Sequence, residues 1–201
     1  HLLSCSVMDR RAAVTALVMP SVLAQVSQSA WPDEFARMWR DSFKEHWRDT
    51  KDYTLAVLDA MPAEGFDTKP HPVQRTFGDQ LRHLAFANVA YLNSFALVPV
   101  PADLTADPKS VQKYANDTDK TSVRKFVLAS FDYVSTVLDA MTQKDLFRKD
   151  LPLFKGVPPH SGTDICMRAY MHTAHHRGQA VVYLRVKGIT PPTWKFEPSG
   201  A

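Results

Sequence analysis

Apolar side chains recur every three or four positions along most of the chain, which is the spacing of one face of an α-helix. The pattern predicts four long helices, over about residues 33–61, 76–97, 119–141 and 161–187. With 7 glycines in 201 residues, the chain lacks the many glycine turns of a β architecture. The 201 residues suffice for one sizeable core. The sequence therefore predicts an all-α fold, a four-helix bundle in one domain.

Capping residues and prolines mark the ends of these helices. Pro62 stops the first helix, because proline cannot continue it. Thr76 and Ser161 are each followed three residues later by an aspartate, a pattern typical of helix N-termini. Gly188 suits the left-handed cap of the last helix, and Ile189 suits the apolar contact that accompanies such a cap.

The connection between the second and third helices is unusually long. It covers residues 98–117 and contains three prolines. Connections in helical bundles are mostly shorter, so these two helices need not be antiparallel neighbours. We therefore expect a four-helix bundle with a long crossover between its second and third helices.

The first thirty residues have the order of a secretory signal. Asp9, Arg10 and Arg11 precede an apolar stretch, residues 12–24, and a small and polar run follows. The apolar stretch is too short for a stable membrane span. The alternative is an ordinary first helix that packs on the domain. We divide the chain into residues 1–30, upstream residues and signal; 31–192, the domain; and 193–201, a C-terminal tail. We expect an exported, periplasmic or extracytoplasmic protein, with a cytoplasmic one as the alternative.

Composition excludes two classes of protein. The formal net charge is +3, but lysine and arginine are scattered among acidic residues without a basic run, so we expect no nucleic-acid partner. Cys5 and Cys166 stand far apart, without the C-x-x-C spacing of a zinc ribbon or the number of cysteines of a disulfide framework.

Three histidines form the candidate metal site. His172 and His176 lie one helical turn apart, with Cβ atoms roughly 5–6 Å from each other, so that both imidazoles can reach one ion. His83 lies on the apolar side of the second helix and is the candidate third ligand. Taken alone, it is more simply a core histidine with one satisfied nitrogen. The positions on its line are small, which leaves room beside the ring: Ala87, Ala90 and Ser94.

Three neutral imidazoles leave a fourth coordination position open for water or substrate, as in catalytic zinc sites. Thr173 stands where the H-E-x-x-H motif of zinc proteases has its glutamate, so the usual general base is missing. Gln179 and Tyr183 share the helix face of the two ligands and are the candidate catalytic side chains. For both, packing or simple exposure is the alternative.

Residues 69–83, 172–179 and 182–192 resemble the DinB-like (DinB/YfiT) metalloenzymes, and the likeness extends over about residues 33–192. The resemblance implies a four-helix bundle with a long crossover. It also implies a zinc or nickel ion on His83, His172 and His176, and a homodimer. Known activities of the family include thiol-cofactor-dependent isomerases and S-transferases.

Two functions follow from this reading. The first is a metal-dependent enzyme of the hydrolase or transferase type that acts on a small-molecule substrate. Because small-molecule thiols are scarce outside the cytoplasm, export argues against the thiol-dependent branch. The second is an exported metal- or ligand-binding protein without catalysis.

Overall fold

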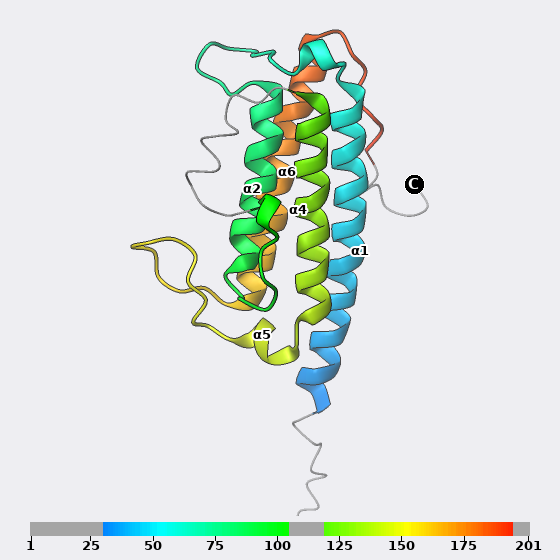
Figure 1. Cartoon of the computed structure of the whole chain (residues 1–201). Coiled ribbons are helices and arrows are strands. Elements are labelled where there is room, and N and C mark those ends of the chain that lie inside the picture. Colours follow the sequence, from blue (N-terminus) through cyan, green and yellow to red (C-terminus); the bar gives the residue numbers. More distant parts are fainter. Residues whose placement is uncertain (1–29, 105–118, 195–201) are drawn as a thin grey trace, which may run out of the picture.

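The computed structural model describes residues 30–104 and 119–194, and side chains from residue 33 onward. In this part of the chain four long helices lie side by side, as Figure 1 shows. They are α1 (Ala30–Ala60), α2 (Phe77–Asn93), α4 (Lys120–Ala140) and α6 (Gly162–Val186). Three short helices connect them: η1 (Ala63–Gly65), η2 (Ala102–Leu104) and α5 (Gln143–Phe147). The predicted all-α class is confirmed.

The predicted N-terminal caps are present in the structure. The Thr76 hydroxyl accepts a hydrogen bond of 3.1 Å from the backbone N–H of Asp79, where α2 begins. The Ser161 hydroxyl accepts one of 3.2 Å from the backbone N–H of Asp164, where α6 begins. Each hydroxyl satisfies a backbone donor that the helix itself leaves free, which fixes where the helix starts.

The C-terminal cap of α6 is also as predicted. Gly188 has φ +73°, a left-handed conformation that glycine adopts without steric cost. Its N–H donates to the Arg185 carbonyl, and the Ile189 N–H donates to the Leu184 carbonyl, both over 2.9 Å. These two bonds are the Schellman motif, and Ile189 packs against the core beside it.

Two elements differ from the expectation. Helix α2 ends at Asn93, four residues before the predicted end at residue 97, because the backbone turns at Ser94 and reaches φ +52° at Ala96. Helix α5 was not predicted. It has five residues, too few to show a helical period, and a bond of 2.8 Å from the Thr142 N–H to the Asp145 carboxylate begins it.

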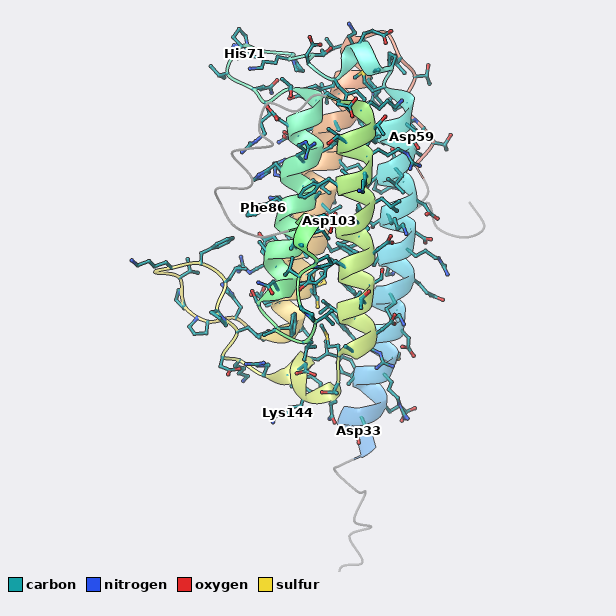
Figure 2. All side chains as sticks on the ribbon, in the orientation of Figure 1. Asp33, Asp59, His71, Phe86, Asp103 and Lys144 are labelled. Carbon is teal, nitrogen blue, oxygen red and sulfur yellow. The ribbon has the colours of Figure 1, made fainter. Side chains whose placement is uncertain are left out.

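The core lies between the four long helices, and Figure 2 shows the side chains on and between them. Trp47 of α1 is 1% exposed, and its ring centroid lies 5.1 Å from that of the fully buried Phe131 of α4. Phe43 is buried and Trp39 is partly buried against the same core, so the aromatic stripe of the first helix packs inward, as predicted.

Helix α6 is held from two sides. The Thr173 hydroxyl donates a buried hydrogen bond of 2.7 Å to Asn88 Oδ1 of α2. On another side, the buried Arg177 guanidinium lies 4.9 Å from the Tyr53 ring of α1 and donates to the Thr50 carbonyl at 3.5 Å. These contacts determine how α6 is rotated and therefore which side chains it presents to α2.

Residues 1–29 and 195–201 and most of the predicted crossover, residues 105–118, lie outside the described part of the chain. The predicted upstream and signal segment, residues 1–30, falls within the first of these ranges except for its last residue, Ala30. Among the described helices, none combines the length and the apolar character that a membrane span needs.

Substituting two glycines of α6 should change stability in opposite directions. A Cβ atom on Gly162 would lie 2.1 Å from the Asp145 carbonyl oxygen, so Gly162→Ala should lower the free energy of unfolding by about 1–3 kcal/mol. A Cβ on Gly178 would meet nothing within 4 Å, so Gly178→Ala should raise it by about 0.5–1 kcal/mol. Urea denaturation of both variants measures the difference. Equal changes in the free energy of unfolding in the two variants would contradict the packing of α6 on α5.

Candidate metal centre

The structure brings the three predicted histidines together. His83 comes from α2, and His172 and His176 come from α6. One possible ligand atom from each lies within 4.8 Å of the others. The ring centroids of His83 lie 5.1 Å from His172 and 4.6 Å from His176, and the two α6 rings lie 4.3 Å apart. In the described part of the chain, this is the one such group of metal-ligating side chains.

These separations suit one ion after a small inward movement of the rings. Zinc binds imidazole nitrogen at about 2.0–2.1 Å, so the nitrogens around a tetrahedral ion lie roughly 3.4 Å apart. His83 and His172 are only partly buried, so rotations of their side chains can close the difference. The donor set is three nitrogens without a thiolate, which suits zinc or nickel.

The site keeps all three imidazoles neutral near pH 7. Burial opposes the charged form and lowers the pKa of His83 and of His172 to about 4, and that of His176 to about 3. Electrostatic repulsion among the rings and from the Arg75 guanidinium contributes in the same direction. Because a metal binds the unprotonated nitrogen, this environment prepares the rings for coordination.

One nitrogen of the cluster is an orphan among the described residues. His172 Nδ1 is buried and has no hydrogen-bond partner there. Leaving a buried polar atom without a partner is costly, and native proteins rarely do so without a reason. A metal ion bound by the cluster is a partner of the right chemistry, and the residues present therefore fit the implied ion.

Thr173 has no access to the centre. It is fully buried in the interface with α2, where it bonds to Asn88. Asp79 is the carboxylate that lies one turn before His83 on α2, and its Oδ1 is buried without a hydrogen-bond partner among the described residues. Burial raises the pKa of this carboxyl. The sequence pattern predicts only a capping role for Asp79, although its spacing of four residues from His83 places both side chains on one face of α2.

The two candidate catalytic side chains have different surroundings. Tyr183 is 3% exposed, and its hydroxyl donates a bond of 2.7 Å to the Arg75 carbonyl, which attaches α6 to the loop before α2. Gln179 is half-buried, and its Nε2 lies 2.8 Å from His175 Nε2. Gln179 also bonds to the buried Gln80 of α2.

Gln80 contacts a candidate ligand directly. Its Nε2 lies 2.6 Å from His176 Nδ1, and the side chain is 2% exposed. Gln80 was not among the predicted site residues. A polar residue at a helix position that faces the core was the only signal available, and that signal does not identify the partner.

An aromatic edge lies beside the cluster. The Tyr91 ring centroid lies 5.8 Å from His172 and 6.3 Å from Phe154. Phe154 belongs to the irregular stretch before α6 and is 55% exposed. A small molecule near His172 would therefore meet apolar ring surface on this side.

Four other described histidines stay outside the cluster. His46 of α1 is exposed, as predicted, and His71 is exposed in the loop before α2 (Figure 2). His160 Nδ1 lies 2.7 Å from the Asp164 carboxylate. His175 is exposed at the edge of the site, with its ring centroid 4.9 Å from that of His176.

The buried imidazoles should make the metal-free protein sensitive to acid. Their pKa values of about 3–4 lie below the ordinary 6.5, so the unfolded chain binds more protons between these values. The free energy of unfolding should therefore fall as the pH drops from about 6.5 toward 4. His172→Gln cannot gain this charge and should show a shallower fall. Urea denaturation with a chelator at about pH 7 and about pH 5 tests this. An equal fall in the free energy of unfolding in the wild type and in His172→Gln would contradict this prediction.

The fold is similar to that of solved structures of DinB-like proteins. A crystal structure of a DinB-like protein from Bacillus cereus is similar with a TM-score of 0.61 and 23% identity, over 77% of this chain and 96% of that one. Another from Bacillus subtilis has a TM-score of 0.58 and 17% identity, over 76% and 96%. These likenesses show the fold alone. No curated protein matches the chain. The family model of the DinB family matches residues 33–197, and the protein therefore belongs to the DinB family.

Proposed function

We propose that the protein binds one divalent ion, zinc or nickel, on His83, His172 and His176 and uses it in a reaction of the hydrolase or transferase type on a small molecule. The observation that carries the proposal is the cluster itself: three imidazoles within 4.8 Å, all held neutral by burial. An ion bound by three imidazoles supplies Lewis acidity at its open coordination position.

The chain's own residues then have separate tasks. Gln80 orients the His176 ring through the contact at Nδ1. Asp79, whose pKa is raised by burial, is a proton-transfer group close to His83 along α2. Tyr91 and Phe154 provide apolar surface for a non-polar part of the substrate. Tyr183 keeps the loop before α2 in place through its bond to the Arg75 carbonyl.

A second candidate function is an exported metal- or ligand-binding protein without catalysis. The burial of Thr173 supports it, because the position that carries the general base in H-E-x-x-H lies in the helix interface here. Asp79 Oδ1, which is buried without a hydrogen-bond partner among the described residues, favours the enzyme instead. Turnover that depends on the bound metal decides between the two.

We also propose that the protein is exported and that it forms a homodimer. The secretory signal would lie within residues 1–30, and N-terminal sequencing of the mature protein tests it. The homodimer rests on the family resemblance, and sedimentation equilibrium of the purified chain tests it.

Metal analysis provides the direct test of the centre. The protein should bind about one equivalent of zinc or nickel, and His172→Ala should reduce this toward zero, since two ligands hold an ion far more weakly than three. His46→Ala is the matched control, because His46 is exposed on α1 and outside the cluster. A wild-type level of metal in His172→Ala would contradict the site.

Substrate profiling tests the reaction. Protein stripped of metal should show no turnover of a panel of small esters, amides and thiol-transfer substrates, and added zinc or nickel should restore it. Turnover that persists without metal would contradict the enzyme. Stoichiometric metal without any turnover would support the binding protein.

A further inference from the structure

A line of four polar side chains runs from the candidate ligand His176 to the surface. His176 Nδ1 lies 2.6 Å from Gln80 Nε2, and Gln80 bonds in turn to Gln179 Oε1. Gln179 Nε2 lies 2.8 Å from Nε2 of His175, which is exposed. The two glutamines come from α2 and α6, so the line crosses the interface between the helices that hold the three histidines.

The donors and acceptors along this line can be arranged in two opposite directions. A glutamine amide exchanges its donor and acceptor ends by a half-turn, and a neutral histidine carries its proton on either nitrogen. In the outward direction, Gln80 Nε2 donates both to His176 Nδ1 and to Gln179 Oε1, and Gln179 Nε2 donates to His175 Nε2. In the inward direction, His175 Nε2–H donates to Gln179 Oε1, and Gln80 Oε1 accepts from both Gln179 Nε2–H and His176 Nδ1–H. Each of the three contacts joins a donor to an acceptor in both directions.

The two directions leave His176 in different tautomers. When Nδ1 accepts from Gln80, the proton of the neutral ring lies on Nε2, and Nε2 then has no lone pair for a metal. When Nδ1–H donates to Gln80, the Nε2 lone pair is free. Ligand histidines are generally oriented by such a donated bond from the nitrogen that does not bind the metal. Coordination through His176 Nε2 is therefore compatible only with the inward direction.

We propose that Gln80 and Gln179 are positioning residues that select the tautomer of His176, and that binding of a divalent cation turns the whole line to the inward direction. In that direction His175 carries its proton on Nε2. This inference rests on the metal site of the proposed function. It goes further, because it assigns a task to two neutral amides where metal sites commonly have a carboxylate or a carbonyl. An amide pair can reverse, whereas a carboxylate only accepts.

Two substitutions of equal charge should have opposite effects on metal affinity. In Gln80→Glu the new carboxylate accepts from His176 Nδ1–H, which enforces the inward direction, so the zinc dissociation constant should fall about tenfold. In Gln179→Glu the new carboxylate accepts from Gln80 Nε2–H, which keeps the amide nitrogen of Gln80 toward His176 Nδ1. This enforces the outward direction at His176, so the dissociation constant should rise about tenfold. Added negative charge alone would tighten zinc binding in both variants.

The experiment measures zinc affinity by competition with a chromogenic chelator on the full chain, together with the ¹⁵N shifts of the histidine side chains. Gln143→Glu on α5 is the matched control and should change the affinity less than about twofold, since Gln143 lies outside the site. The shifts should place the His176 proton on Nδ1 in Gln80→Glu and on Nε2 in Gln179→Glu, both without metal. Zinc-loaded wild type should show the proton on Nδ1.

The outcomes separate this inference from the proposed function. Tightening of zinc binding in both variants, or the same His176 tautomer in both metal-free proteins, would overturn the inference while the metal site stands. A wild-type chain that binds no zinc or nickel would overturn both. Gln80 is buried, so if Gln80→Glu does not fold, the half-buried Gln179→Glu decides. Weaker zinc binding with an Nε2–H tautomer supports the inference, and tighter binding overturns it.

Discussion

The hydrogen bond from Thr173 to Asn88 is the constraint on which the metal centre depends. Both side chains are fully buried, so this hydrogen bond forms only when α2 and α6 meet in one register. A slip of one helical turn would move the facing residues by about 5.4 Å. Because His172 adjoins Thr173 on α6 and His83 precedes Asn88 by little more than one turn on α2, the register that satisfies this bond also brings the imidazoles together.

The same packing sets the chemistry of the rings. Burial between two helices opposes protonation of the three imidazoles, so the cost of desolvating a charge is avoided by keeping them neutral. Neutral imidazole is the form that coordinates a metal. Helix α6 also holds the buried cation of Arg177, which lies against the Tyr53 ring and the α1 backbone, away from the histidines. One helix thus carries both a buried cation for packing and neutral rings for binding.

Membership of the DinB family accounts for the fold and is compatible with metal binding, whereas the reaction depends on side chains around the centre. Here those side chains are unlike the H-E-x-x-H arrangement. Thr173 points into the helix interface, and the carboxylate of Asp79 comes from α2. The polar partner of His176 is the amide of Gln80, which bonds in turn to the amide of Gln179, and an amide can donate or accept.

The sequence by itself determined the features that depend on near neighbours along the chain. The caps at Thr76 and Ser161, the Schellman motif at Gly188 and the one-turn spacing of His172 and His176 were all predicted, because each arises from backbone geometry within a few residues. Only the tertiary structure brought His83 to α6 and Gln80 to His176, across 93 and 96 residues of chain. Such contacts depend on how all the helices pack around one core, and local periodicity carries no information about the partner of a buried polar side chain.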